Sequence, residues 1–174
     1  MKKKIIFIGG IHGVGKGTVC NLLCDRFKLE HFSASELLKW SEISSKTNKK
    51  VQNIDQTQTR LLNGIERHIT DNRLSILDGH LCLLNNFGVP EKVAEEVMIK
   101  ISPQLIGVVT ENLQVVKDRL EARDGVEYEI SSLEEMQALE IAQGKKLANL
   151  LDINFVEIIG GDIINISQRI EALI

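Results

Sequence analysis

Gly10-Ile11-His12-Gly13-Val14-Gly15-Lys16-Gly17-Thr18 is the most informative segment of this chain of 174 residues. It follows the apolar run Lys4–Ile8 and precedes a stretch that we expect to be helical from Lys16 to about Phe27. Glycines let the backbone curl so that successive N–H groups point at phosphate oxygens, and a helix N-terminus adds a partial positive charge. The segment therefore predicts a phosphate-binding loop whose lysine follows the β- and γ-phosphates of ATP or a similar nucleotide.

The order of residues after the lysine departs from the common form of such loops. That form places Ser or Thr directly after the lysine, where the hydroxyl holds Mg²⁺. Here Gly17 takes that place and Thr18 offers its hydroxyl one residue later, so Thr18 is a candidate Mg²⁺ ligand. His12, inside the loop, either touches phosphate or only fills its position.

Short β-rich runs alternate with longer amphipathic stretches, which is typical of a parallel sheet covered by helices. The pattern predicts an α/β fold, a three-layer αβα sandwich around a five-stranded parallel sheet. The expected strands are Lys4–Ile8, Glu30–Ser33, Leu74–Leu77, Leu105–Val109 and Phe155–Ile159. The expected helices after the first are Ser35–Trp40, Thr57–Asp71, Pro90–Ile101, Glu111–Arg123, one from a capping box at Ser131 or Ser132 to about Leu151, and one capped by Asp162.

Composition narrows the class of protein. Hydrophobic residues make up 43%, charged residues 26%, and the formal net charge is -3, so no basic field favours nucleic acid or an acidic membrane. No apolar run reaches the roughly 18 residues of a membrane span, and we expect a cytoplasmic protein. A protein partner is possible but not indicated. Cys20 and Cys24 share one helical face, yet no second pair or histidine cluster completes a zinc site, so we expect both to be buried.

The form G-x-x-G-x-G-K-G-T resembles the phosphate loop of adenylate kinases. His31–Lys39 (HFSASELLK) is similar to a stretch that helps to bind the nucleoside monophosphate in that family. The resemblance implies acceptor contacts from Ser33 and Lys39, although Lys39 stands in place of an arginine. A solvated lysine behind a helix cap is the alternative. Arg60 lies on the helix that covers the acceptor in the family, with a solvated arginine as its alternative.

Ile76-Leu77-Asp78-Gly79-His80 resembles the I-L-D-G-F segment of the same family. A carboxylate at this strand end is placed to orient Mg²⁺ through water, so Asp78 is a candidate metal residue; otherwise it orients the loop. The arginine that often follows in the family is absent. His80 is shared with archaeal-type and nuclear adenylate kinases, and either contacts the acceptor, shuttles a proton or is a satisfied core histidine.

Arg119-Leu120-Glu121-Ala122-Arg123 resembles the R-L-x-x-R pattern before the lid of these relatives. The resemblance implies that Arg119 and Arg123 join Lys16 as catalytic groups that neutralise charge during transfer. The alternative is an exposed face with Asp118–Arg123 or Arg119–Glu121 pairs. The lid that follows is short and acidic and contains no arginine.

Taken together, residues 1–174 resemble a single nucleoside monophosphate kinase-like P-loop NTPase domain, with an acceptor-binding insert at about 34–72 and a lid at about 123–131. The first hypothesis is a kinase that uses ATP and Mg²⁺ to phosphorylate a nucleoside monophosphate. A kinase for a nucleoside or small metabolite is the second. The third is a nucleotide-gated ATPase or assembly factor, whose partner surface would include Trp40 and the polar stretch to Asn53.

Overall fold

The computed structural model describes residues 3–38, 54–84 and 89–174, and the side chains of 54–58 are not described. Lys39, Trp40 and the rest of the polar stretch to Asn53 therefore lie outside the described residues. The central sheet has five strands in the order β2-β3-β1-β6-β7, and every pairing in it is parallel. Its strands are β1 (Lys4–Gly9), β2 (Glu30–Ser33), β3 (Leu74–Asp78), β6 (Leu105–Thr110) and β7 (Asn154–Ile159).

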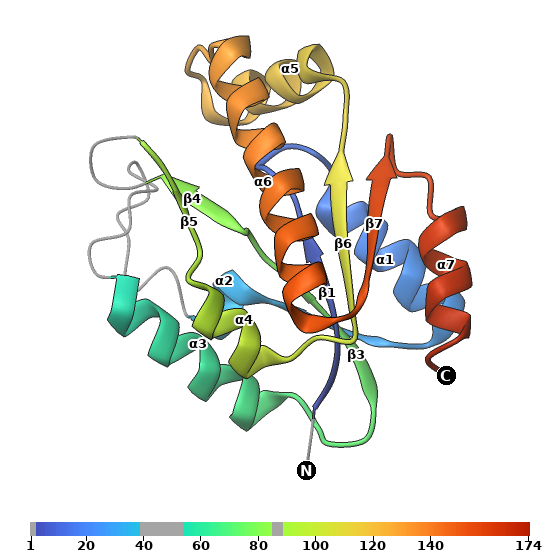
Figure 1. The fold of residues 1–174 in the computed structure, drawn as a ribbon. Coiled ribbons are helices and arrows are strands. Elements are labelled where there is room, and N and C mark those ends of the chain that lie inside the picture. Colours follow the sequence, from blue (N-terminus) through green and yellow to red (C-terminus); the bar gives the residue numbers. More distant parts are fainter. Residues whose placement is uncertain (1–2, 39–53, 85–88) are drawn as a thin grey trace.

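Alternation along β1 shows how the sheet forms two cores. Ile6 and Ile8 belong to one buried cluster, with residues of α1 (Lys16–Phe27) and α7 (Ile164–Glu171). Ile5 and Phe7 belong to the other, with residues of α3 (Ile54–His68), α4 (Glu95–Ile101) and α6 (Ile130–Leu151). Because both faces of a parallel sheet are covered, its central strand is buried and without polar side chains from Ile5 to Gly9. The predicted three-layer α/β architecture is confirmed (Figure 1).

The remaining elements lie near the carboxyl ends of the strands. The short α2 (Ala34–Leu37) follows β2 directly, and α5 (Leu113–Asp124) follows β6. A small antiparallel hairpin of β4 (Cys82–Leu84) and β5 (Pro90–Lys92) follows β3. In Figure 1, α5 and the start of α6 stand above the sheet, on the side to which the phosphate loop emerges from β1. These elements surround the loop with side chains from distant parts of the sequence.

Two local predictions were wrong. Pro90 does not begin a helix: it pairs with Leu84 in the hairpin, where a residue without an N–H is tolerated at a strand edge. The helix begins at Glu95, where two acidic residues interact well with its N-terminal dipole. The capping box at Ser131 or Ser132 is also absent, because α6 begins at Ile130 and no side chain caps it.

Candidate functional site

The phosphate loop joins β1 to α1, and its glycines are required by the backbone. Gly10, Gly13 and Gly15 have φ of 137°, 78° and 98°, values that other residues rarely adopt. A Cβ at Gly10 would lie 2.7 Å from the carbonyl oxygen of Val109, so the loop passes directly over the end of β6. Gly15 is the N-cap of α1, which turns the loop into the helix. The predicted strand, loop and helix are all confirmed.

Lys16 folds back over this loop. Its Nζ donates to the carbonyl oxygens of Gly10, at 2.7 Å, and of Ile11, at 3.1 Å. Burial lowers the pKa of Lys16, while the charges of Glu140 and Asp78 act in the opposite direction. The ammonium group is therefore held against the loop backbone, where the charges of two carboxylates act on it. A bound phosphate would offer it a better partner than two neutral carbonyls.

Glu140 is a buried carboxylate beneath the loop that the sequence analysis did not identify. It is fully buried on α6 and accepts backbone N–H groups from Gly10 (3.2 Å), Leu81 (3.0 Å) and Cys82 (3.2 Å). Burial raises its pKa to about 7, although the three N–H groups and Lys16 oppose that rise. One side chain thus joins the start of the phosphate loop to the turn after β3.

The spacing of the helix contains a signal for this residue. Glu140 lies seven residues after Leu133 and seven before Leu147, both of which are buried on α6. Residues seven apart share one helical face, so a charged residue stands where an apolar one is expected. A buried charge needs paired partners, and those partners come from residues 59 and 130 positions away. The pattern marks the position, but the sequence does not show its partners.

Two histidines meet beside the loop. The rings of His12 and His80 have centroids 4.1 Å apart at an interplanar angle of 45°. Nδ1 of His80 also lies 3.7 Å from Oε1 of Glu140. His12 is thus packed against a second ring, and His80 links the end of β3 to the loop and to the buried carboxylate.

Asp78 ends β3 next to the loop. Its Oδ2 lies 2.8 Å from Nε2 of His31 on β2, a partner that the sequence analysis did not identify. Burial acts to raise the pKa of Asp78, but His31 and Lys16 outweigh it and the pKa is lowered. An ionised oxygen donor beside a phosphate loop suits Mg²⁺, which commonly takes one carboxylate together with substrate phosphates. Thr18, also predicted as a metal residue, is exposed on the first turn of α1.

Arg119 and Arg123 project from α5. Nη1 of Arg119 donates to the carbonyl oxygen of Gly13 at 3.3 Å, and Nη2 to Glu111 at 3.4 Å. Arg123 forms a two-point ion pair with Asp124 at 2.7 and 2.8 Å. Its charge is one of those that lower the pKa of Lys16. The structure therefore places Arg119 in contact with the loop, while the guanidinium of Arg123 is held by Asp124.

The ion pairs of these arginines differ from those in the alternative interpretation. Arg119 pairs with Glu111, and not with Glu121. Arg123 pairs with Asp124, and not with Asp118. Glu121 instead pairs with Lys117, and Asp118 accepts a hydrogen bond from Gln114. The Asp124 carboxylate also accepts from the hydroxyl of Tyr128 at 2.6 Å. The residues at the predicted lid thus fix the direction of the Arg123 guanidinium.

The predicted acceptor residues are less closely gathered. The Ser33 and Ser35 hydroxyls lie 2.7 Å apart at the start of α2. Arg60 lines a cavity of about 220 Å³ between α2 and α3, together with Arg67 and His68. Lys39 lies outside the described residues. Ser33 therefore stands at the end of β2 beside Asp78, while Arg60 belongs to the face between the two helices.

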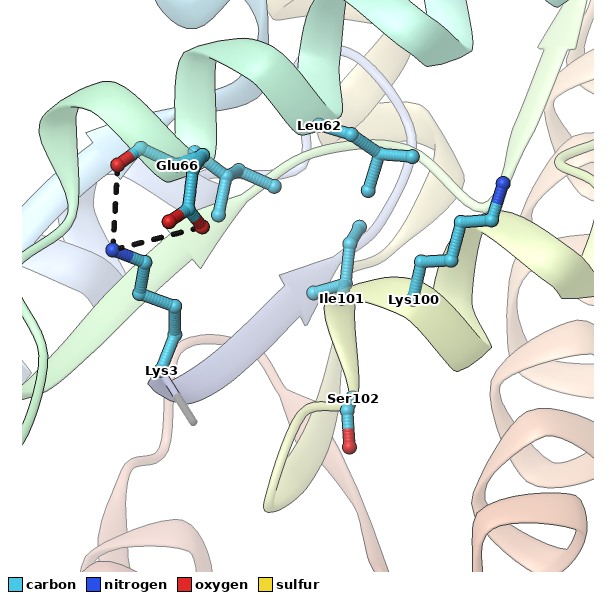
Figure 2. Close-up of a pocket in the computed structure, with 7 residues that line it drawn as sticks. Lys3, Leu62, Glu66, Lys100, Ile101 and Ser102 are labelled. Carbon is cyan, nitrogen blue, oxygen red and sulfur yellow. Dashed lines mark hydrogen bonds and ion pairs between the residues drawn. The ribbon is translucent and has the colours of Figure 1, made fainter. Parts of the chain in front are cut away.

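A cavity of about 330 Å³ lies at the opposite ends of the strands, between α3 and α4. Figure 2 shows Lys3 reaching Glu66 of α3, while Lys100 of α4 points away from it. Lys3 also donates to the carbonyl oxygen of Ile69 at 2.6 Å. Ligands of open parallel sheets bind at the carboxyl ends of the strands, so we assign this cavity to helix packing and not to catalysis.

Comparison with known proteins agrees with this geometry. The AAA domain family matches residues 9–137, which contain the whole phosphate loop, β3 and α5. This chain belongs to the AAA domain family. No helix in the described ranges of this AAA domain chain has the length and apolar character needed to cross a bilayer.

The curated relatives carry the name adenylate kinase. Two of them, from Prochlorococcus marinus strains NATL1A and NATL2A, are each 34% identical over 118 residues. A third, from Synechococcus sp. strain CC9311, is 33% identical over 97 residues, 55% of this chain and 51% of the relative. The two Prochlorococcus matches span 63% of this chain and 61% of the length of the relatives. The resemblance to adenylate kinases is thus confirmed over part of both chains.

Solved structures share the fold at low identity. A gluconokinase from Sinorhizobium meliloti 1021 has a TM-score of 0.53 at 14% identity, over 90% of this chain and 82% of that one. A sugar kinase from Janibacter sp. HTCC2649 has a TM-score of 0.55 at 16% identity, over 90% and 85%. An uncharacterized protein from Eubacterium ventriosum ATCC 27560 has a TM-score of 0.52 at 16% identity, over 98% of both chains. These likenesses support the P-loop α/β fold of the AAA domain chain.

Proposed function

We propose that this AAA domain chain is an ATP-dependent phosphotransferase whose acceptor is a nucleoside monophosphate. The observation that carries the proposal is that Arg119 contacts the phosphate loop that contains Lys16, with Arg123 on the same helix. Lys16 lies within the loop, Arg119 donates to Gly13 of the loop, and the charge of Arg123 acts on Lys16. Phosphoryl transfer develops charge on oxygens that such groups stabilise, and positioning supplies most of the remaining rate.

Each residue has a stated part in this reaction. Backbone N–H groups of the loop and Lys16 hold the β- and γ-phosphates, and Arg119 and Arg123 neutralise charge on the transferred group. An oxygen of the acceptor phosphate attacks the γ-phosphorus while the bond to the ADP oxygen breaks. Asp78 would hold Mg²⁺ through water, and the ion would offset the charge of the nucleotide phosphates. Ser33, with Lys39 and Arg60, would bind the acceptor.

The choice of acceptor rests on the chemistry of the site and on its relatives. An acceptor phosphate is already an ionised nucleophile and needs no general base, so arginine and lysine suffice as catalytic groups. The relatives at 33–34% identity are named adenylate kinase. A nucleoside monophosphate is therefore the acceptor that we test first.

The pairing of His80 with Glu140 favours a second candidate, a kinase for a hydroxyl acceptor. An alcohol must lose a proton during transfer, and a histidine oriented by a carboxylate is a common general base. Nδ1 of His80, a partly exposed side chain beside the loop, lies 3.7 Å from Oε1 of the fully buried Glu140. Two structural neighbours are named gluconokinase and sugar kinase, although at 14–16% identity they support only the fold.

One experiment separates these acceptors. The purified chain is incubated with Mg·ATP and either a panel of nucleoside monophosphates or a panel of nucleosides, sugars and sugar acids, and the products are separated by chromatography. Lys16→Ala excludes a contaminating kinase. Lys100→Ala is the matched control, because it removes an exposed lysine that lines the distant cavity.

The proposal expects a nucleoside diphosphate product that is lost in Lys16→Ala and retained in Lys100→Ala. A phosphorylated alcohol would instead establish the second candidate. Release of ADP with no phosphorylated acceptor would contradict both and support the nucleotide-gated ATPase.

A further inference from the structure

Three potential metal ligands converge beside the phosphate loop from three different elements. They are Sγ of Cys20 on α1, Nε2 of His31 on β2 and a carboxylate oxygen of Asp78 on β3, and all three atoms lie within 4.8 Å of one another. Cys24, which shares a helical face with Cys20, is not part of this group. The sheet instead provides partners that are 11 and 58 residues away in the sequence.

The burial of the group suits a closed site with one open side. Cys20 is fully buried in the core and is a free thiol. The side chains of His31 and Asp78 are 25% and 13% exposed, so an ion can reach the group from the side of β2. Cys24, one turn further along α1, is only partly buried and packs against the core cluster.

The combination of donors indicates the kind of metal. A thiolate, an imidazole and a carboxylate are ligands of Zn²⁺, whereas Mg²⁺ takes oxygen donors. Three protein ligands with a fourth position left to water is the usual form of a zinc site that exchanges its outer ligand. The sulfur is the decisive donor, because soft thiolates select Zn²⁺ and its chemical neighbours.

The geometry requires only small adjustments. Zn²⁺ lies about 2.0–2.3 Å from nitrogen, oxygen and sulfur ligands, so tetrahedral ligand atoms are separated by roughly 3.3–3.8 Å. Nε2 of His31 and Oδ2 of Asp78 are now 2.8 Å apart and would separate slightly. The sulfur, within 4.8 Å, would approach them. Binding would release the thiol proton to solvent.

We propose that Cys20, His31 and Asp78 form a binding site for a thiophilic divalent transition metal, Zn²⁺ by its donor set, at the edge of the phosphate loop. The site goes beyond the proposed kinase activity and its Mg²⁺. One consequence rests on that activity: Asp78 cannot serve both ions, so Zn²⁺ at this site would remove the carboxylate proposed to orient Mg²⁺.

Co²⁺ is the probe, because it occupies zinc sites and gives visible bands in tetrahedral coordination and a near-ultraviolet band when a thiolate binds it. The full-length chain is treated with a chelator, dialysed and titrated with Co²⁺ in the absence of nucleotide. Zn²⁺ is then added to displace it, which gives the Zn²⁺ affinity. Since no nucleotide is present, the result does not depend on whether the chain is a kinase.

Matched variants assign the ligands. Cys20→Ser removes the sulfur from the group, and Cys24→Ser makes the same change on the same helix outside it. His31→Gln tests a ligand whose side chain is partly exposed, so this variant remains informative if the buried cysteine variant does not fold. Circular dichroism establishes that each protein used is folded.

We expect about one equivalent of Co²⁺ with a thiolate band in the wild type and in Cys24→Ser. Cys20→Ser should lose the thiolate band. Both Cys20→Ser and His31→Gln should bind Zn²⁺ about 10- to 100-fold more weakly or worse, because even mutations of residues that only support the ligands reduce metal affinity by this factor. A band that persists in Cys20→Ser, or Zn²⁺ affinities for His31→Gln within twofold of the wild type, would overturn the proposal.

Discussion

Glu140 determines how the phosphate loop is held at the scale of single residues. Glu140→Ala leaves three buried N–H groups without an acceptor, and each such group costs about 1–3 kcal/mol. Glu140→Gln keeps one acceptor oxygen but turns an amide donor toward those N–H groups. We expect the free energy of unfolding, measured by urea denaturation at pH 6, to fall by about 3 kcal/mol or more for alanine and by about 1–3 kcal/mol for glutamine.

Glu135→Gln is the matched control, because Glu135 is exposed on the same helix. It should change the free energy of unfolding by no more than about 0.5 kcal/mol. Equal effects of Glu135→Gln and Glu140→Gln would mean that the buried contacts contribute nothing measurable.

The ion pair between Arg123 and Asp124 gives a prediction about nucleotide affinity. The carboxylate neutralises a guanidinium that a bound phosphate would also use. Asp124→Asn removes this competitor, so we expect ATP to bind about two- to fivefold more tightly, the range that partly exposed ion pairs permit. Isothermal titration with a non-hydrolysable ATP analogue measures the dissociation constant.

Asp118→Asn makes the same charge change on α5, at a side chain that accepts a hydrogen bond from Gln114. This variant should change the affinity for the ATP analogue only slightly, because salt screens the effect of a surface charge. If both variants tighten binding equally, only net charge matters and the contact between Arg123 and Asp124 has no separate role.

Local spacing explains which residues the sequence could identify. Gly10–Thr18 form one continuous segment, so their glycines and lysine identify the loop without knowledge of the fold. Glu140 and His31 act through partners 130 and 47 residues away. Such pairings exist only once the sheet has formed, and single-sequence patterns do not contain them. The sequence therefore predicted the loop but missed two of the groups around it.

Helices and strands lie where the sequence predicted them wherever a single hydrophobic pattern dominated the segment. The central strands β1 and β6 are nearly continuous apolar runs, and the positions of all five parallel strands were predicted closely. The hairpin of β4 and β5 was missed, because strands of three residues are too short to show alternation. Pro90, a helix-start signal by its fixed φ, is equally suited to a strand edge. Pairing with Leu84 decided between the two.

The packing of α6 on the sheet gives a prediction at the scale of elements. A Cβ at Gly144 would lie 2.8 Å from both Phe155 and Val108, so the helix approaches β6 and β7 more closely than alanine allows. Alanine favours an exposed helix by about 1 kcal/mol over glycine, but overpacking costs about 1–3 kcal/mol. We expect Gly144→Ala to lower the melting temperature in spite of its higher helix propensity.

Differential scanning calorimetry measures that change, with Ser131→Ala as the control on an exposed position of the same helix. Ser131→Ala should leave the melting temperature unchanged or raise it slightly. A higher melting temperature for Gly144→Ala would show that α6 can move away from the sheet at little cost.

The stability of the whole molecule should depend on pH through two carboxylates that act with opposite signs, the partly buried Asp78 and the fully buried Glu140. The lowered pKa of Asp78 means that its contribution is present above its ordinary value of 3.8 and is lost as the pH falls through the folded value. The raised pKa of Glu140 acts in the other direction. Its native state retains a proton that the unfolded chain has released, between pH 4.5 and about 7. Stability from Glu140 is therefore full below pH 4.5 and declines as the pH rises through that window.

Comparing the wild type with Glu140→Gln isolates this contribution, because every other titrating group is common to both. Urea denaturation at constant ionic strength from pH 5 to pH 8 should show the stability advantage of the wild type shrinking as pH rises. The total change is at most about 3 kcal/mol, since one pKa unit is worth about 1.4 kcal/mol. The change should level off above about pH 7, where Glu140 is ionised in both states. Parallel pH profiles would instead mean that the backbone N–H groups and Lys16 offset the burial of this carboxylate completely, leaving Glu140 ionised beneath the loop throughout the range.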